Sequence, residues 1–377
     1  MDYRKIGTNW LKHVTFKVRI IRRVSYFRRK LIKGENMAKA GNYYYEQLNK
    51  EQQKAYYAIK EGLLNLQDSF AVPMLSTKEL SDIYFMIRMD CPLIFYSTTF
   101  SYKYYKDSTA VEMVPQYLFS KDKIKEHRQA MEARVKKLAR QAADLDEKGK
   151  ELFIHDFIVG NVKYDKLKKS YSHEIIGALG NGVAVCEGIA KAVKILCDEL
   201  NIWCIIALSE ANPDKGIKYR HAWNVIKIGG QYYHLDVTFD NTLSRDDIVR
   251  YDYVNLSDKQ IFRDHEPVIW KVPVCSDNDH FYYKEKKVSW TTMDEVRNRT
   301  KQAVKKGKVL LFHWRGGYLT REVLMELLEI FDQEAKVKEK HARVSVNWSQ
   351  AVLRVRFETG IGEEQIEMEE ANEGEKN

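Results

Sequence analysis

VCEGIAKAVKILCDEL, residues 185–200, places a cysteine at the start of an apolar helical pattern. Its apolar residues recur every three or four positions, which predicts a helix with one buried face. Cys186 then lies in the first turn, where unpaired backbone N–H groups and the positive end of the helix dipole favour a thiolate. A small buried hydrophobic side chain is the commoner role of an unpaired cysteine, so the pattern alone leaves both interpretations open.

YRHAWNVIKIGGQYYHLDVTFD, residues 219–240, predicts a β-hairpin. Two runs rich in β-branched and aromatic residues flank a Gly-Gly pair at 229–230, which is typical of a two-residue turn. Ile228 then pairs with Gln231, and this first pair fixes the register of the whole hairpin.

The register brings a histidine and an aspartate onto one face. It sets His221 opposite Thr238 and Trp223 opposite Asp236, so His221 and Asp236 are diagonal neighbours about 7–8 Å apart at the backbone. A carboxylate on one ring nitrogen fixes the tautomer of an imidazole, and the other nitrogen can then take a proton from a thiol. His234 lies on the same face and is a competing candidate. His221 is preferred because it begins its strand, near a rim that a substrate could reach.

The order of Cys186, His221 and Asp236, and the segments around them, resemble the transglutaminase-like superfamily. VCEGIAKA, HAWNVI and YYHLDVTFD are similar to segments of the bacterial transglutaminase-like domains, which are relatives of papain-type cysteine peptidases. IHDFIVGNVKYD at 154–165 resembles the helix before the cysteine, and the resemblance covers roughly residues 140–260. It implies Cys186 as nucleophile, His221 as general base and Asp236 as the residue that orients the histidine.

The resemblance also implies a reaction and a substrate class. A thiolate attacks the acyl carbon of a carboxamide or peptide bond, and the resulting thioester passes to an amine or to water, so the expected partner is a protein or peptide. Tyr164, Glu187 and Trp223 are expected to line the substrate and oxyanion site, although an aromatic such as Tyr164 more often packs in a core. The sequence shows no acidic loop with calcium-ligand spacing, so neither a metal nor another cofactor is expected. The competing interpretation is a catalytically retired domain that binds or scaffolds a peptide or glycan.

The cysteine content indicates a reducing compartment. Five cysteines without a C-x-x-C pair suggest neither a disulfide framework nor a zinc site. No apolar stretch of secretory or membrane-spanning length occurs near the N-terminus, so a cytoplasmic protein is expected, with action at the cell surface or outside the cell left open. The five are Cys91, Cys186, Cys197, Cys204 and Cys275.

The net positive charge of the chain comes from its first residues. Residues 1–36 hold eleven Lys and Arg against Asp2 and Glu35, which accounts for the whole net charge of +9. Their interleaved apolar residues would allow weak contact with an anionic membrane or another polyanion, but no specific nucleic-acid partner is expected. Met37 precedes the first globular pattern and could be the native start. The sequence sets no oligomeric state.

The chain as a whole is predicted to be of the α+β class. A papain-like core, in which the helix that carries Cys186 packs on an antiparallel sheet, is expected between a mostly helical N-terminal domain and a small C-terminal α/β appendage. The expected boundaries are 1–36 for the basic tail, 37–140 for the N-terminal helical and aromatic domain, 141–290 for the catalytic core, 291–360 for the appendage and 361–377 for an acidic disordered tail.

Local patterns predict the elements outside the core. Residues 41–75 and 122–147 favour helices, and the tyrosine-rich run at 94–105 favours strands. Near the C-terminus, KVLLFHWRGGYLT predicts a strand and a Gly-Gly turn. A helix from about 321 to 333 and strands at 342–348 and 351–357 are expected after it.

Overall fold

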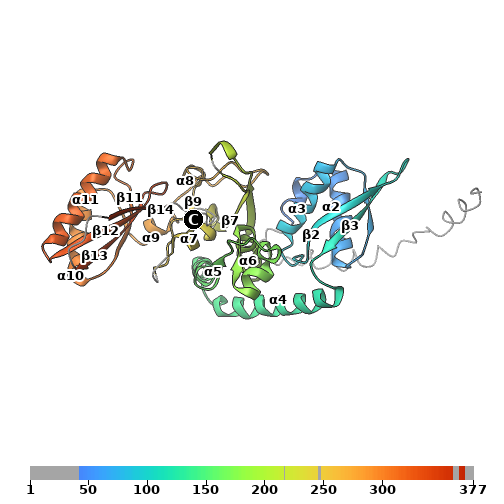
Figure 1. The fold of residues 1–377 in the computed structure, drawn as a ribbon, viewed down its shortest axis with the longest axis horizontal. Coiled ribbons are helices and arrows are strands. Elements are labelled where there is room, and N and C mark those ends of the chain that lie inside the picture. The colour runs from blue at the N-terminus through green and yellow to red at the C-terminus, as the bar shows by residue number, and fades with distance from the viewer. Residues whose placement is uncertain (1–41, 216, 245–247, 360–364, 370–377) are drawn as a thin grey trace, which may run out of the picture. The chain divides into compact units, whose positions relative to one another are not determined.

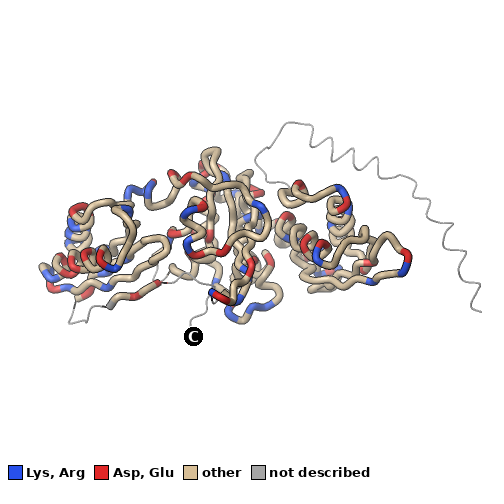
Figure 2. The backbone as a smooth tube through the Cα atoms, turned by 90° about the horizontal axis from the view of Figure 1, so that it is seen from above, with Lys and Arg blue, Asp and Glu red and all other residues tan. Residues whose placement is uncertain are grey.

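Helices are interspersed with strands that form mainly antiparallel sheets, which confirms the α+β class (Figure 1). The computed structural model describes residues 42–215, 217–244, 248–359 and 365–369, so the basic segment 1–36 lies outside the described residues. Lysines and arginines are interspersed with acidic residues along the described backbone (Figure 2). None of the helices within these ranges has the length and apolar character needed to cross a membrane.

The N-terminal region combines helices with a three-stranded antiparallel sheet in the order β1-β3-β2. The expected helix over 41–75 is wrong in extent, because Asn49 caps a helix that begins only at Lys50 and ends at Leu64. The tyrosine-rich run does form a strand, β2. The elements are η1 (Tyr45–Gln47), α2 (Lys50–Leu64), β1 (Phe70–Pro73), α3 (Thr77–Asp90), β2 (Ser97–Tyr104) and β3 (Ala110–Tyr117).

The helix expected over 122–147 forms as α4 (Lys121–Ala142), which ends five residues early, and the helix expected before the cysteine forms as α5 (Glu147–Asn161). α5 begins after Asp146, whose carboxylate accepts a hydrogen bond from the Gly149 amide at 2.7 Å. Such a cap starts a new helix. Both helices pack on α6 (Cys186–Glu199), which carries the cysteine (Figure 1).

The core places α6 (Cys186–Glu199) against a four-stranded antiparallel sheet in the order β6-β7-β8-β9. Every residue of the central strand β7 is buried except Lys227, which is partly exposed. The strands and longer helices of this region are β4 (Lys163–Tyr164), β5 (Val183–Ala184), β6 (Cys204–Ser209), β7 (His221–Ile228), β8 (Gln231–Leu235), α7 (Val237–Leu243) and β9 (Val254–Leu256). The short helices are η2 (Ser170–His173), η3 (Ile176–Asn181), η4 (Pro213–Lys215), α8 (Asp258–Ile261) and α9 (Tyr282–Glu285).

The predicted hairpin register is confirmed near the turn and wrong at its far end. Ile228 pairs with Gln231, and the ladder continues to Asn224 opposite Leu235. Beyond that pair the predicted partners of Trp223 and His221 do not form, because β8 ends at Leu235. The Asp236 carboxylate caps α7 there, accepting the amide hydrogens of residues 238 and 239 at 2.8 and 3.1 Å.

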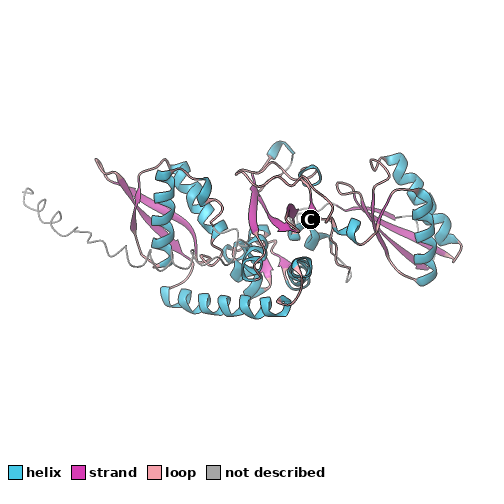
Figure 3. Ribbon diagram, turned by 180° about the vertical axis from the view of Figure 1, so that it is seen from behind, coloured by secondary structure: helices cyan, strands magenta, loops and turns pink. Residues whose placement is uncertain are grey.

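The C-terminal region is a five-stranded sheet in the order β10-β11-β13-β12-β14, with two helices packed against it (Figure 3). The predicted strand–helix–strand–strand order is confirmed. Disorder from 361 onward is wrong for residues 365–369, because they add the strand β14 parallel to β12; residues 370–377 lie outside the described residues. The elements are β10 (Ser289–Trp290), α10 (Met293–Lys306), β11 (Leu310–Trp314), α11 (Arg321–Lys336), β12 (Lys340–Asn347), β13 (Val352–Thr359) and β14 (Gln365–Glu369).

Candidate active site

Cys186 is the first residue of α6, as the sequence predicts. Val185 before it is extended, and the cysteine is 6% exposed and in no disulfide. The backbone around this turn is tightly packed, since a Cβ added at Gly188 would lie 2.2 Å from the carbonyl oxygen of Ser172. Glycine is therefore needed two residues after the cysteine, and the first turn of the helix is held against its neighbour.

The buried amide of Asn224 connects α6 to the sheet. Its Nδ2 donates to the carbonyl oxygen of Ala190, one turn after the cysteine, at 3.0 Å and also lies 3.2 Å from the carbonyl oxygen of Ile205 on β6. Cys186 and Ala222, the second residue of β7, belong to one hydrophobic cluster. The start of the helix and the start of β7 are therefore held by one packed core.

His221 and Asp236 meet as the sequence predicts. His221 is the first residue of β7, and its Nε2 lies 2.6 Å from Asp236 Oδ2. The imidazole stacks on Trp223, with ring centroids 5.7 Å apart and an angle of 16° between the planes. A carboxylate at Nε2 and an aromatic ring on one face together fix the orientation of the imidazole.

Asp236 is fully buried, and both of its oxygens are used. Oδ1 caps α7, while Oδ2 faces two imidazoles, the second being that of His265, whose Nε2 lies 2.9 Å away. Burial alone would raise the pKa of Asp236, but His221 and His265 outweigh it and hold the pKa well below its usual value. The carboxylate is therefore ionised throughout the neutral range.

His265 is a site residue that the sequence reasoning missed. Its other ring nitrogen, Nδ1, lies 2.8 Å from Asp264 Oδ1, so this buried imidazole bridges two carboxylates. Burial lowers the pKa of His265, but the bonds to Asp236 and Asp264 outweigh it and raise the pKa above its ordinary value. It lies beyond residue 260, where the family resemblance ends, and no regular strand or helix there gives a register.

His234, the competing candidate, belongs to a separate pair. Its Nδ1 accepts the indole N–H of Trp223 at 3.0 Å, and its Nε2 lies 2.8 Å from Asp258 Oδ1. Burial lowers the pKa of His234 despite the neighbouring carboxylate. Trp223, predicted to line the site, therefore contacts both imidazoles, with its ring face toward one and its N–H toward the other.

Glu187, also predicted to line the site, points into a buried charge cluster. Its Oε1 lies 2.8 Å from Nη2 of Arg88 on α3 and 2.7 Å from Nζ of Lys191 on α6. Glu174 accepts from the same two cations, so two carboxylates neutralise two cations. Burial would raise the pKa of Glu187, but Arg88 and Lys191 hold it well below its usual value. The cluster joins the N-terminal region to the residue that follows Cys186.

Tyr164, the predicted oxyanion contributor, lies half-buried on β4 and pairs in parallel with Ala184 on β5. Ala184 stands two residues before Cys186. The pairing brings the backbone of Tyr164 beside the segment that leads into the cysteine.

Two groups of side chains within the described ranges have metal-ligand chemistry: the first is His221, Asp236 and His265, and the second is His234, Asp258 and Cys275. In the second, the indole N–H donated to Nδ1 requires the proton of neutral His234 to be on Nε2, the atom that would have to bind a metal. Burial also raises the pKa of the Cys275 thiol far above its ordinary value. In the first group both imidazoles direct Nε2 at one carboxylate oxygen. Hydrogen bonds among these side chains therefore explain why each group lies together.

Residues 135–237 match the family model described as the transglutaminase-like superfamily. The matched segment runs from within α4 to the first residue of α7 and includes all three predicted triad residues. No curated protein matches the chain.

The similar solved structures are distant. A TGase is 10% identical over 45% of this chain and 50% of that one, with a TM-score of 0.24. A proposed cysteine protease from Cytophaga hutchinsonii is 18% identical over 37% and 61%, with a TM-score of 0.25, and a proposed protease from Parabacteroides distasonis is 15% identical over 37% and 36%, with a TM-score of 0.24. The chain thus spans between about a third and three fifths of the length of these proteins. The part of the chain that carries Cys186, His221 and Asp236 is therefore the part that matches the transglutaminase-like superfamily.

Proposed function

We propose that the protein is a cysteine-dependent enzyme that transfers or hydrolyses the acyl group of amide or peptide bonds through a thioester. Cys186 is the nucleophile, His221 the general base and Asp236 the residue that orients the histidine. The observation that carries the proposal is the 2.6 Å contact between His221 Nε2 and Asp236 Oδ2, on a strand packed against the helix that begins with Cys186.

The proposed reaction begins when Nδ1 of His221 takes the thiol proton, since Nε2 is engaged with Asp236. The Sγ–C bond forms as the carbonyl π electrons move to oxygen, giving a tetrahedral oxyanion. The oxyanion collapses, the C–N bond breaks and the imidazolium gives its proton to the departing amine, which leaves a thioester. Water or a second amine then gives a proton to His221 and attacks the thioester, and the thiolate leaves.

The electrostatics of the site support this order of reaction steps. Asp236 is an ionised, fully buried carboxylate that stabilises the imidazolium formed in each half of the reaction. The backbone N–H of Cys186, in the first turn of α6, is the proposed first oxyanion donor. The Tyr164 hydroxyl is the proposed second donor, from the strand beside the segment that leads into the cysteine. Glu187 and Trp223 are proposed to shape the site rather than to react.

Selective alkylation tests the nucleophile without knowledge of the substrate. Burial raises the pKa of Cys91, Cys197 and Cys275, so those thiols stay protonated at neutral pH. We expect iodoacetamide at pH 7 to modify Cys186 first, as read by peptide mass spectrometry. Alkylation of Cys186 no faster than of the other cysteines would contradict the proposal and favour a catalytically retired binding module.

The activity test uses a mixed peptide library for hydrolysis and a fluorescent primary amine for incorporation into protein. Cys186→Ala removes the nucleophile, so both activities should fall to background while circular dichroism and thermal unfolding stay close to wild type. The matched control is Cys197→Ala, which removes a thiol buried on the same helix. Full activity in Cys186→Ala would disprove the mechanism.

A further inference from the structure

His265 has an environment that the triad alone does not require. Its side chain is fully buried, and each of its ring nitrogens faces a carboxylate, with Nε2 2.9 Å from Asp236 Oδ2 and Nδ1 2.8 Å from Asp264 Oδ1. Its ring centroid lies 5.2 Å from that of His221. His265 and His221 thus contact the same oxygen of Asp236, Oδ2.

Both contacts of His265 require the charged form of the ring. An ionised carboxylate only accepts hydrogen bonds, and a neutral imidazole carries one N–H, so two carboxylate partners need a proton on each nitrogen. The second carboxylate is itself held, because Asp264 Oδ2 accepts from the Tyr253 hydroxyl at 2.6 Å and from Gln350 Nε2 at 3.2 Å. An imidazolium fixed between two anions is thereby built into the site.

We infer that His265 is a positioning residue of the reaction: an imidazolium that holds the Asp236 carboxylate in the rotamer and the charge state that His221 requires. The inference rests on the proposed function. His265 acts through Asp236 and touches no reacting atom. Without it, Oδ2 keeps a single imidazole partner, and the carboxylate is held only by that partner and by the amides at the start of α7.

The same geometry extends the site to the C-terminal region. Gln350 lies between β12 and β13, is 1% exposed, and donates to Asp264. The contacts therefore run from Gln350 through Asp264 and His265 to Asp236 and end at His221. The C-terminal sheet thereby supports the orientation of an imidazole that it does not touch in the described contacts.

Two substitutions separate the hydrogen bond of His265 from its charge. His265→Leu removes both, and His265→Gln keeps an N–H donor for Asp236 without the charge. We expect His265→Leu to slow the alkylation of Cys186 by iodoacetamide at pH 7 by about 10–100-fold, because the carboxylate behind His221 loses its orientation. His265→Gln should recover most of that rate.

The pH profile supplies a readout that a merely structural role would not move. With the cation gone, the full charge of Asp236 acts on His221 and raises its pKa, so the acidic limb of the alkylation profile, where protonated His221 cannot take the thiol proton, should move up by roughly one pH unit in His265→Gln. The titratable groups that face His265 are Asp236, Asp264, His221, Tyr253 and His234.

The chain offers a matched control in His155. This imidazole is equally buried and also faces two carboxylates, with Nδ1 2.9 Å from Asp156 Oδ1 and Nε2 3.2 Å from Asp240 Oδ2. It contacts no triad residue in the described set. His155→Leu should lower stability as His265→Leu does but leave the alkylation profile unchanged. Equal profiles for the two leucine variants would overturn the inference.

Nitrogen NMR of histidine-labelled protein separates this inference from the proposed function. At pH 7 we expect both ring nitrogens of His265 to carry protons, and we expect the Nε2 proton signal of His221 to shift in His265→Leu. An unprotonated nitrogen on His265, or an unshifted His221 signal, would overturn the inference. Slow alkylation of Cys186 in the wild type would instead count against the proposed enzyme, while the NMR signals still decide the role of His265.

Discussion

Asp236 has two tasks, and each belongs to one of its oxygens. Oδ1 accepts the first amides of α7, and Oδ2 faces the Nε2 atoms of His221 and His265. A substitution that respects one task and not the other therefore separates folding from catalysis at a single residue.

Asp236→Asn is the substitution that makes this separation. Asparagine is as good a helix cap as aspartate, but its NH₂ group replaces the oxygen that two N–H donors face, and rotating the amide only moves the mismatch to the helix. We expect activity to fall by roughly 10³–10⁴-fold, as for the equivalent change in a serine triad. Asp236→Ala also removes the cap, so urea unfolding should show it to be about 1 kcal/mol less stable than Asp236→Asn. An Asn variant with wild-type rates would refute the orienting role.

The contrast between His221 and His265 shows what the sequence can predict. His221 and Asp236 are 15 residues apart, and the register set at the turn brings their segments together, although Asp236 itself leaves the ladder and caps α7. His265 lies 29 residues after Asp236 in a segment without a repeating pattern, and Arg88 is 99 residues from Glu187. Contacts of that kind depend on how whole elements pack, and no periodicity in the sequence predicts them.

At the scale of elements, the same limit applies to the ends of helices and strands. The predicted ladder fails beyond Leu235 because a side chain that the pattern placed on a strand, Asp236, caps a helix instead. The helix expected over 122–147 likewise ends early, at Ala142, and Asp146 within its predicted range caps the next helix instead. A sequence can indicate capping residues, but an aspartate in an alternating run is compatible with a strand residue or with a helix cap. Tertiary packing decides which of the two forms.

The contact between α5 and β9 gives a prediction about pH and stability. Glu151 is fully buried, and burial raises its pKa from 4.5 to about 7, although Asn255 Nδ2 donates to its Oε2 at 3.0 Å. Glu151 Oε1 and Asn255 Oδ1 have no hydrogen-bond partner among the described residues, so the pair lacks one donor. A proton on Glu151 can supply that donor, and so can the amide of glutamine.

The sign follows from the raised pKa. The folded protein holds this proton more tightly than the unfolded chain, so stability is greatest below about pH 4.5 for this group and falls as the pH rises to about 7, by up to roughly 3 kcal/mol. Glu151→Gln should therefore be more stable than wild type above pH 7 and lose this part of the pH dependence, as read by urea unfolding at pH 5 and pH 8. Equal losses of stability in both proteins between these pH values would contradict it.

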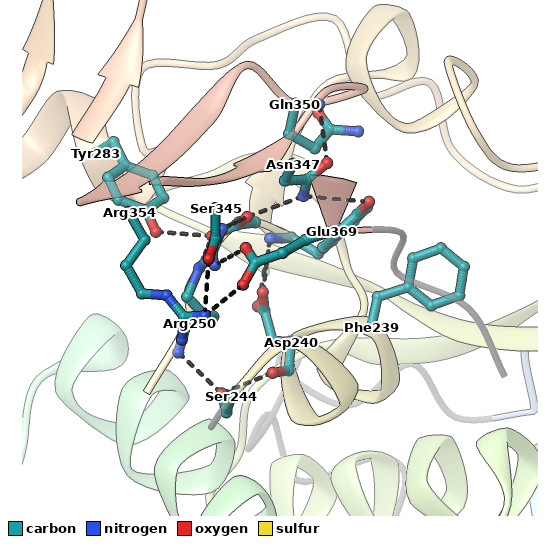
Figure 4. Close-up of polar contacts among 12 residues, drawn as sticks. Phe239, Asp240, Ser244, Arg250, Tyr283, Ser345, Asn347, Gln350, Arg354 and Glu369 are labelled. Carbon is teal, nitrogen blue, oxygen red and sulfur yellow. Dashed lines mark hydrogen bonds and ion pairs between the residues drawn. The ribbon is translucent and has the colours of Figure 1, made fainter. Parts of the chain in front are cut away.

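At the scale of the whole molecule, the regions are joined by buried polar contacts as well as by apolar packing. The N-terminal region shares one hydrophobic cluster with the core, whereas most of the C-terminal sheet has its own. Val352 on β13 also belongs to a buried apolar cluster with core residues such as Phe239. A polar network around Arg250 adds to this packing. The Arg250 guanidinium contacts Asp252 and, on β14, Glu369; Figure 4 shows Arg250 beside Glu369. Glu369 Oε1 also accepts from Arg354 Nη2 at 2.7 Å, so one carboxylate serves two buried cations.

Removing that carboxylate should uncouple the C-terminal sheet from the core. Glu369→Leu removes the Glu369 contacts of both Arg250 and Arg354, which should cost about 3–5 kcal/mol, the usual effect of breaking a buried ion pair from one side. We expect calorimetry to show one unfolding transition in the wild type and two in the variant, with the C-terminal sheet melting first. Glu326→Gln, on the exposed face of α11, is the control and should leave the trace unchanged. A single transition at the wild-type temperature in Glu369→Leu would mean that apolar packing alone joins the two regions.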